Sequence, residues 1–427
     1  MKILQITAGA ATMYCGSCLR DNTLAVELMA MGHDVLLLPF YTPTLTDERN
    51  VSANRVFFNG ISVYLEQNFP VFRHTPRFVD RIWESDFALR AATKRSISVD
   101  PKQLGEMTVS MLRGESGPLR KEFEKLKDWL GQQPAPDIVS LPYTLLSALA
   151  APLRESLRRP VACTLQGEDF FLEALPEPYR SESLALIREN SKHVDLFLAV
   201  SGHSKDLMAD YLGLAKDRIE VVPLGINLDG YGPVVRDRRP PFRIGYLARI
   251  TPEKGLHRLC EAFRILCSNP AAPASTLEAA GYVAPEHTGY LKELERHTPG
   301  LTYHGSLDRA GKARFLKSLD VFSVPTVYKE SKGIFLLEAM ANGVPVVQPR
   351  QGSFPEILEK TGGGLLVDPD SPEALADGIL RLLTDSELAR RLAQQGAAGV
   401  AEHYPVRKMA EGTIAAFEKV LAGPGRR

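Results

Sequence analysis

Strand-like and helix-like segments alternate along most of this chain, and the alternation starts twice. In the first run, β-prone apolar stretches such as 161–165 and 196–200 are separated by helix-length segments. A stretch rich in Pro, Gly and Arg at 230–241 interrupts the pattern, which begins again at 242–247. Alternation of this kind is typical of a parallel sheet with helices on both faces. The sequence therefore predicts an α/β protein with two doubly wound, Rossmann-like domains.

Most elements can be placed from their patterns. Strands are expected at 2–8, 33–40, 137–141, 161–165, 196–200 and 219–222, then at 242–247, 277–281, 301–305 and 321–324. Helices are expected at 19–31, 143–157, 183–193, 204–212 and 334–341, in three stretches between 76 and 130, and from 371 onward. The stretch 55–65 differs, because Asn59-Gly60 divides two short β-prone runs, and this pattern predicts a hairpin.

Charge and cysteine content exclude some classes of protein. The 427 residues carry 51 Lys and Arg against 51 Asp and Glu, whereas a general nucleic-acid-binding protein would carry a basic excess. Five cysteines in so long a chain fit a reduced, cytoplasmic setting better than a disulfide framework. The uncharged run 138–153 is too short to span a bilayer and contains Pro142 and Pro152.

A modest cluster of basic residues lies between 73 and 95. Two interpretations remain open: solvated faces of helices, or a peripheral contact with the inner face of a membrane. The cluster consists of Arg73, Arg77, Arg81, Arg90, Lys94 and Arg95.

The stretch 320–347 contains the most informative chemistry. Its pattern predicts a strand, a polar loop at 330–333, an apolar helix at 334–341 and a second strand. Glu338 is the one charge on that helix, which should otherwise be buried on all sides, so its carboxylate needs a partner. Glu330 lies in the loop beside a helix N-terminus that suits phosphate. Together these features indicate a nucleotide-sugar site, although Glu338 could also be a core acid paired with a Lys or Arg.

The spacing of Glu330 and Glu338, followed by Ala339-Met340-Ala341-x-Gly343-x-Pro345-Val346-Val347, resembles the acidic signature of glycosyltransferase family 4. Members of that family are retaining enzymes of the GT-B fold. The resemblance implies that Glu330 faces the donor sugar and that Glu338 holds the ribose. The residues after Glu330 would offer backbone amides to the sugar and diphosphate: Ser331, Lys332, Gly333 and Ile334. Lys332 departs from the family, which often has an aromatic or other apolar residue there.

Two cations follow the first strand of the second domain. Arg249 and Lys254 lie where an open α/β sheet binds ligands, so they are well placed for a diphosphate. The resembled family has an Arg and a Lys at these positions, while surface ion pairing is the alternative. Gly305, at the end of another strand, could border the nucleotide base.

The loop after the first strand, 9–18, also lies at a strand end and lacks the GxGxxG spacing of a nicotinamide site. By resemblance, Gly9 and Gly16 would lie near the donor phosphates and Tyr14 on the acceptor side. Cys15 and Cys18 form a CxxC at a helix start, which leaves ordinary thiols, a redox role or a metal role open.

Two later strand ends in the first half carry polar residues. Gln166 stands where the resembled family commonly has a histidine that faces the sugar. Glu168, Asp169 and His203 are expected on the acceptor side, and His203 fits a helix start better than a catalytic base.

The resemblance, taken together with these observations, implies an expected function. Residues 1–232 would bind the acceptor, residues 233–405 would bind the donor across a cleft, and a helix in 406–427 would cross back to the first domain. The expected reaction is retaining transfer of a hexose from a UDP- or GDP-linked donor to a carbohydrate, lipid or small-molecule acceptor, without a metal or other cofactor. Glu330, Gln166, Arg249 and Lys254 would be catalytic. The alternatives are a nucleotide-sugar epimerase and a non-catalytic nucleotide-sugar-binding protein of the same fold.

Overall fold

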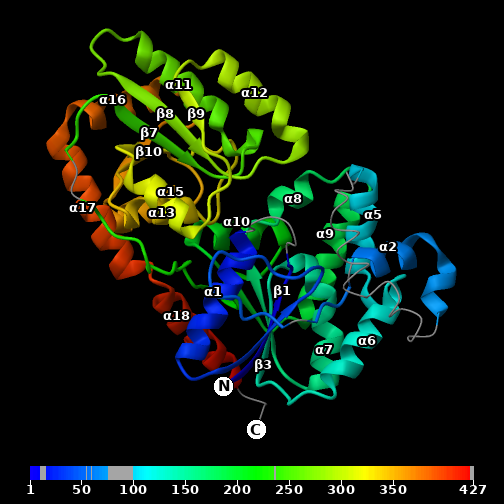
Figure 1. Cartoon of the computed structure of the whole chain (residues 1–427). Coiled ribbons are helices and arrows are strands. Elements are labelled where there is room, and N and C mark those ends of the chain that lie inside the picture. Colours follow the sequence, from blue (N-terminus) through cyan, green and yellow to red (C-terminus); the bar gives the residue numbers. More distant parts are fainter. Residues whose placement is uncertain (10–15, 54, 59, 76–99, 235–236, 424–427) are drawn as a thin grey trace. The chain divides into compact units, whose positions relative to one another are not determined.

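The chain forms two compact units (Figure 1). The computed structural model describes residues 1–9, 16–53, 55–58, 60–75, 100–234 and 237–423. The first unit consists of Met1–Pro223 and Ala410–Arg427, and the second of Leu224–Met409. The sequence placed these divisions after residue 232 and before residue 406. The segment after Leu224 belongs to the second unit because it pairs there, for example through the bridge between Ile226 and Pro405.

The first unit is built on a six-stranded parallel sheet with the order β2-β1-β3-β4-β5-β6. Its strands β3 and β4 are buried at every position, as expected where helices cover both faces of a parallel sheet. The strands are β1 (Lys2–Thr7), β2 (Asp34–Pro39), β3 (Ile138–Leu141), β4 (Val161–Leu165), β5 (Leu196–Ala199) and β6 (Ile219–Val221).

Helices of the first unit enclose a core in which Phe40 stacks on Phe58 with ring centroids 4.3 Å apart. The helices are α1 (Gly16–Ala30), α2 (Gly60–Asn68), α5 (Pro101–Leu112), α6 (Arg120–Leu130), α7 (Ala150–Leu157), α8 (Asp169–Glu173), α9 (Tyr179–Asn190), α10 (Gly202–Leu212) and α18 (Val406–Leu421). Residues of α18 from Ala410 onward belong to this unit.

The expected hairpin at 55–65 is wrong, because α2 is a helix that begins at Gly60. Its buried side chains, Ser62, Val63 and Glu66, recur at the three-to-four spacing of one helix face rather than alternating. Val63 joins the core of the unit. Burial of this face overrides the strand propensity of the local sequence.

The second unit has its own six-stranded parallel sheet with the order β12-β11-β10-β7-β8-β9. The strands are β7 (Phe242–Leu247), β8 (Ser275–Ala280), β9 (Leu301–Tyr303), β10 (Val321–Phe322), β11 (Val346–Pro349) and β12 (Gly364–Val367). The helices are α11 (Leu256–Ser268), α12 (Thr288–His297), α13 (Arg309–Lys317), α14 (Ile334–Ala341), α15 (Phe354–Thr361), α16 (Pro372–Thr384) and α17 (Ser386–His403). None of the helices in the described ranges is long and apolar enough to cross a membrane.

Helix α14 is not buried on all sides, contrary to the expectation from its apolar sequence. Leu336, Leu337 and Met340 are buried in the core of the second unit. Ile334, Phe335 and Glu338 are only partly buried. The helix therefore has one partly open side, and that side includes Glu338.

Candidate active site

The loops after β7 and β10 form the centre of the candidate site. These strands are neighbours in the sheet and run parallel, so their carboxyl ends lie at the same edge. Arg249 and Lys254 follow β7, and Glu330 follows β10. In open α/β sheets this edge is where ligands bind.

The loop after β7 is fixed by packing and by backbone contacts. Gly255 has a φ of +76°, and a Cβ there would lie 1.9 Å from the carbonyl oxygen of Pro325, so only glycine permits this approach. The N–H of Val327 donates to the carbonyl of Glu253 over 2.9 Å. These contacts hold the loop with Lys254 against the loop with Glu330.

Tyr246, a buried residue of β7, fixes the same loop from the core side. Its ring is completely buried, and its hydroxyl donates to the carbonyl oxygens of Arg249 and Lys254 over 3.1 and 3.4 Å. The backbone of both cations is thereby tied to the core of the second unit.

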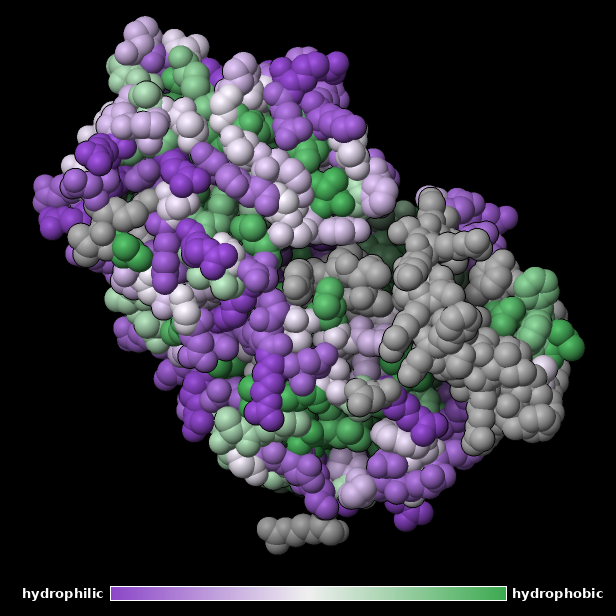
Figure 2. All heavy atoms as spheres, in the orientation of Figure 1, coloured by the Kyte–Doolittle hydropathy of each residue, from purple (hydrophilic) through white to green (hydrophobic). Residues whose placement is uncertain are grey.

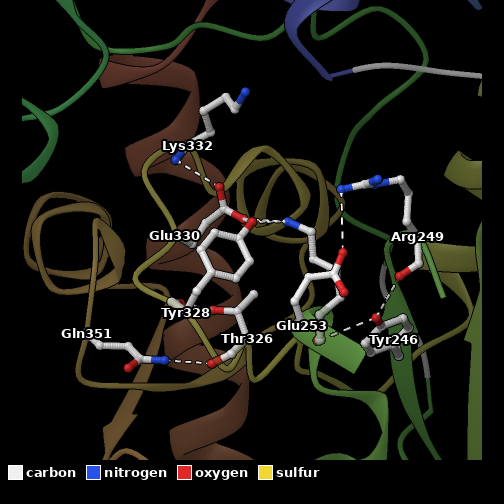
Figure 3. A network of polar contacts seen from close by, with 9 residues as sticks. Tyr246, Arg249, Glu253, Thr326, Tyr328, Glu330, Lys332 and Gln351 are labelled. Atoms are coloured by element: carbon white, nitrogen blue, oxygen red, sulfur yellow. Dashed lines mark hydrogen bonds and ion pairs between the residues drawn. The ribbon is translucent and has the colours of Figure 1, made fainter. Parts of the chain in front are cut away.

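Lys254, Tyr328 and Glu330 form a compact polar group. The amine of Lys254 donates to Oε2 of Glu330 over 2.6 Å, and the Tyr328 hydroxyl donates to the same oxygen over 2.6 Å. The amine also lies 2.5 Å from the Tyr328 hydroxyl oxygen. Figure 3 shows Tyr328 and Glu330 pointing toward one another. The backbone N–H of Lys332 donates to Oε1 of Glu330 over 3.1 Å.

Glu330 is an anion at any working pH. Glu330 is 2% exposed, and burial alone would raise the pKa of its carboxyl group. The charge of Lys254 and the hydrogen bonds from Lys254 and Tyr328 outweigh burial and lower the pKa to about 2. Burial first, and then the charge of Glu330, raise the pKa of Tyr328, so its hydroxyl stays protonated.

Arg249 is more exposed than Lys254 and less firmly paired. Its guanidinium points toward Glu253 in Figure 3, with Nη2 of Arg249 and Oε1 of Glu253 3.9 Å apart. The side chain is 47% exposed. An ion pair this long and exposed contributes little, so the guanidinium can turn to an incoming anion at low cost.

Helix α14 begins directly after this group. Gly333 is its N-cap residue with a φ of +64°, and Ile334 is its first residue. The first N–H groups of a helix have no intrahelical acceptor and carry a partial positive charge. Ser331 is buried in the same loop.

Gly305, expected to border the nucleotide base, lies in the segment after β9. Its carbonyl accepts from the N–H of Gly281 over 2.9 Å, at the same edge of the sheet.

Glu338 lies on the partly open side of α14 and has the basic partner that a core acid would need. Lys312 donates from Nζ to Oε1 of Glu338 over 2.9 Å, and the Tyr231 hydroxyl donates to the same oxygen over 2.9 Å. Lys312 is the kind of partner that the alternative interpretation of Glu338 predicted, a core acid paired with a Lys or Arg, and the ribose-holding role of Glu338 stays a prediction.

In the first unit, Gln166 lies directly after β4 and is 3% exposed. Its Nε2 donates to the carbonyl of Pro142 over 2.6 Å, and its backbone N–H donates to Oε2 of Glu168 over 2.8 Å. Oε1 of Gln166 is buried, and none of the described residues donates to it. A buried acceptor of this kind is suited to a hydroxyl group of a ligand.

Glu168 holds the loops after β3 and β4 together. Its Oε1 accepts from the N–H and the hydroxyl of Thr144 over 3.1 and 2.9 Å. Burial raises the pKa of Glu168, while these hydrogen bonds act in the opposite direction. Its expected place on the acceptor side stays a prediction.

The remaining expected residues of the first unit lie at or near strand ends. Gly9 follows β1 with a φ of +79°, and a Cβ there would lie 1.7 Å from the carbonyl oxygen of Thr42. Gly16 is the first residue of α1, Asp169 the first of α8, and His203 the second of α10. Tyr14 lies outside the described residues.

Whether Cys15 and Cys18 have a redox or metal role stays open, because the structure describes only one of the two residues. Cys18 is a buried residue of α1, and Cys15 lies outside the described residues.

Sequence reasoning missed three residues of these networks: Tyr328, Tyr231 and Lys312. Tyr328 had a signal, since it is a polar ring two residues before Glu330 in the same loop. Tyr231 and Lys312 had none, because 107 and 26 residues separate them from Glu338.

Solved structures with this fold cover nearly the whole chain. Sucrose-phosphate synthase from Thermosynechococcus elongatus superposes with a TM-score of 0.70 at 18% identity, over 98% of this chain and 99% of that one. HepE from Anabaena in complex with UDP gives a TM-score of 0.68 at 18% identity, over 98% and 100%. With its two Rossmann-like units, the chain is a protein of the GT-B fold.

Two family models match it. The model described as "Glycosyl transferases group 1" matches residues 236–398, and the one described as "Glycosyltransferase Family 4" matches residues 108–229. The chain belongs to glycosyltransferase family 4.

Curated relatives match over part of their length. Phosphatidyl-myo-inositol mannosyltransferase from Mycobacterium tuberculosis is 31% identical over 237 residues, which are 53% of this chain and 60% of that protein. D-inositol 3-phosphate glycosyltransferase from Corynebacterium glutamicum is 29% identical over 214 residues, 44% of this chain and 49% of that protein.

Proposed function

We propose that the protein is a retaining hexosyltransferase that uses a UDP- or GDP-linked donor and a carbohydrate, lipid or small-molecule acceptor. The observation that carries this proposal is the pairing of Lys254 with Glu330 beside the N-terminus of α14. Cations and helix amides suit a diphosphate, and a buried anionic carboxylate suits the hydroxyl groups of a sugar. The relatives named as a mannosyltransferase and a glycosyltransferase, and HepE in complex with UDP, support the same class of reaction.

Lys254 can serve the sugar side and the phosphate side together. An ammonium group has three N–H donors. Two of them are directed to Glu330 and to the Tyr328 hydroxyl, which leaves one for a phosphate oxygen. Arg249 would supply the second cation, and the amides of α14 would supply further donors.

In the proposed reaction the bond between the anomeric carbon and the diphosphate oxygen breaks. The acceptor oxygen bonds to the same face of that carbon, and its proton passes to the departing diphosphate. The growing negative charge on the diphosphate would be stabilised by Arg249, Lys254 and the helix amides. Neither a carboxylate nucleophile nor a metal is required, so we include metal independence in the proposal.

Gln166 would orient the acceptor or the sugar rather than take a proton. Its amide cannot act as a base, but Oε1 can accept a hydrogen bond from a hydroxyl group. The hydrogen bond from Nε2 to Pro142 fixes the direction of Oε1.

We place the protein in the cytoplasm and include a peripheral membrane contact through the first unit. Phe69 and Val71, just after α2, are 46% and 67% exposed. Figure 2 shows a hydrophobic patch over this end of the unit. Exposed apolar side chains next to Arg73 suit an anionic lipid surface. The other members of the basic cluster, from Arg77 to Arg95, lie outside the described residues.

The first experiment is calorimetry with UDP, GDP and ADP and with their glucose and mannose derivatives. We expect one nucleotide sugar to bind and to yield a glycosylated product with retained configuration when a panel of acceptors is added. Interconversion of the sugar without transfer would favour an epimerase. Binding without transfer or hydrolysis would favour the non-catalytic protein, and no binding to any of these compounds would refute the proposed function.

A further inference from the structure

The second unit contains a large pocket away from the candidate active site. We propose that this pocket is a second ligand site, which takes a small molecule with an apolar body and one carboxylate group, and that Arg238 binds the carboxylate. The volume of the pocket is about 670 Å³, which lies in the range of pockets that hold small molecules. None of the residues that line it is among those expected to bind the donor, so the site is independent of the proposed function.

The pocket lies at the amino ends of two strands of the second sheet. Asp320 directly precedes β10, Pro345 directly precedes β11, and both residues line the pocket. Because β7, β10 and β11 run parallel, this is the edge of the sheet opposite to the loops that carry Lys254 and Glu330. A molecule bound here would not occupy the donor site.

Apolar and charged side chains both line this pocket. The apolar ones come from the segment before β7, from the residues before β10 and β11 and from helix α17: Pro233, Val234, Leu319, Pro345, Ala389 and Ala393. Val234 is half-exposed, so an apolar ligand that contacts it would remove apolar surface from water. The charged side chains are Arg238, Asp320, Glu387 and Arg390.

Arg238 has a hydrogen-bond donor that the protein does not use. Its Nη2 donates to the carbonyl of Leu382, in the last turn of α16, over 3.0 Å, and its Nε lies 3.7 Å from Oδ1 of Asp320. Its Nη1 is buried and has no acceptor among the described residues. A buried N–H group calls for an acceptor. Because Arg238 lines the pocket, a ligand oxygen there can be that acceptor.

The charge of Arg238 is only partly offset by its partner. Burial lowers the pKa of the Arg238 guanidinium, and the charge of Asp320 raises this pKa by a smaller amount. The other carboxylate oxygen of Asp320 accepts from the backbone N–H of Arg243 over 2.9 Å. A further anion next to Arg238 would therefore stabilise the guanidinium in its buried position.

The surroundings favour one negative charge over two. Ser386 and Glu387, the first residues of α17, line the pocket, and the N–H groups at the start of a helix carry a partial positive charge. Arg390, on the same helix, adds a second guanidinium. Asp320 and Glu387 balance the charges of the two arginines, so each additional negative charge on a ligand meets repulsion. A single carboxylate thus suits the pocket better than a phosphate dianion.

The test uses three compounds that share a naphthalene ring. Calorimetry with the full chain would compare 1-naphthaleneacetate with the neutral 1-naphthaleneacetamide and with 1-naphthyl phosphate. For the parent protein we expect the carboxylate to bind about 10- to 100-fold more tightly than the amide, as for a hydrogen bond to a charged group. The phosphate should bind more weakly than the carboxylate, and saturating UDP, GDP or ADP should displace neither.

Two variants locate the binding in the pocket. In Arg238→Met the ratio between carboxylate and amide should fall to a few-fold, because Nη1 is removed. In Ala393→Trp all three compounds should bind more weakly, because the indole ring fills the space of the ligand. Arg391→Met is the matched control: Arg391 is an exposed arginine of α17 that is not among the described residues lining the pocket, so its loss should leave the affinities at the parent values.

Several results would overturn the proposal. They are equal binding of carboxylate and amide to the parent protein, an unchanged ratio in Arg238→Met, unchanged affinities in Ala393→Trp, and displacement of the carboxylate by a nucleotide. Tighter binding of the phosphate than of the carboxylate would refute the carboxylate assignment. If Arg238→Met does not fold because Asp320 loses its partner, Ala393→Trp decides alone, since Ala393 is only partly buried.

Discussion

The amine of Lys254 lies 2.6 Å from Oε2 of Glu330, so a residue expected to bind diphosphate is paired with one expected to face the sugar. Only 12% of the Lys254 side chain and 3% of the Glu330 side chain are exposed. Removing one member of such a buried ion pair leaves the charge of the other member uncompensated. The two residues therefore affect stability as well as binding, and their variants must be interpreted together.

A double-mutant cycle should show this coupling. Lys254→Met and Glu330→Gln are each expected to lower the free energy of unfolding by about 3 kcal/mol, because each leaves a buried group without its partner. The double variant should lose less than the sum of the two. Urea denaturation of the full chain measures these losses, and hydrogen exchange in β7 assigns them to the second unit.

The control for this cycle is Lys329→Met, since Lys329 is exposed and adjacent to Glu330 in the sequence. Its free energy of unfolding should stay within about 0.5 kcal/mol of the parent value. Strictly additive losses in the cycle would mean that the pair is not coupled.

Acid should weaken the second unit through Glu330. The pKa of its carboxyl in the folded protein is about 2, against an ordinary value of 4.5 for a glutamate. A lowered pKa contributes stability that is fully present above pH 4.5 and is lost as the pH falls through 2. The shift corresponds to about 3 kcal/mol. Denaturation curves between pH 5 and pH 2 should show this loss in the parent and a smaller loss in Glu330→Gln. Equal pH dependence of the two proteins would contradict the assignment of the low pKa to Glu330.

Arg249 should affect binding without affecting stability. Arg249→Ala removes a half-exposed cation whose ion pair with Glu253 spans 3.9 Å, so the melting temperature of the variant should match that of the parent. Affinity for the nucleoside diphosphate should fall at least 10-fold, as for the loss of a charge-assisted contact. Calorimetry measures the affinity, and Arg264→Ala on α11 is the control with no expected effect. Unchanged affinity in Arg249→Ala would place the diphosphate elsewhere.

The fold was accessible from the sequence because its signals are local. Apolar runs ending in polar or glycine-bearing loops predicted the parallel strands of both units, and the loops after β7 and β10 followed from them. The segment α2 was not accessible, since its short β-prone sequence becomes helical only through burial of Val63 and Glu66 on one face.

The candidate site divides in the same way. Glu330 and Lys254 were found from loop position, but their direct pairing depends on the approach of two loops 76 residues apart in sequence. The hydrogen bond from Tyr231 to Glu338 was not accessible either, because Tyr231 lies in the stretch 230–241, whose composition predicted only a linker. Contacts between distant segments are fixed by packing, which no local pattern encodes.

Gln166 provides the sharpest test of the reaction, and Gln5 provides a control matched in burial and bonding. Both residues are 3% exposed, both donate from Nε2 to a backbone carbonyl, and Oε1 of both lacks a described donor. Gln5 lies within β1, whereas Gln166 follows the end of β4, where ligands bind in an open α/β sheet.

We therefore expect Gln166→Ala to reduce product formation at least 10-fold with donor affinity unchanged, because the lost group only orients a hydroxyl group. Gln166→His should keep part of the activity, and Gln5→Ala should lose stability in proportion to its burial but keep its rate per folded molecule. Equal rate losses in Gln5→Ala and Gln166→Ala would reduce Gln166 to a structural residue. A parent protein that binds donor without turnover, combined with an active Gln166→His variant, would show that the reaction needs a base which this chain lacks.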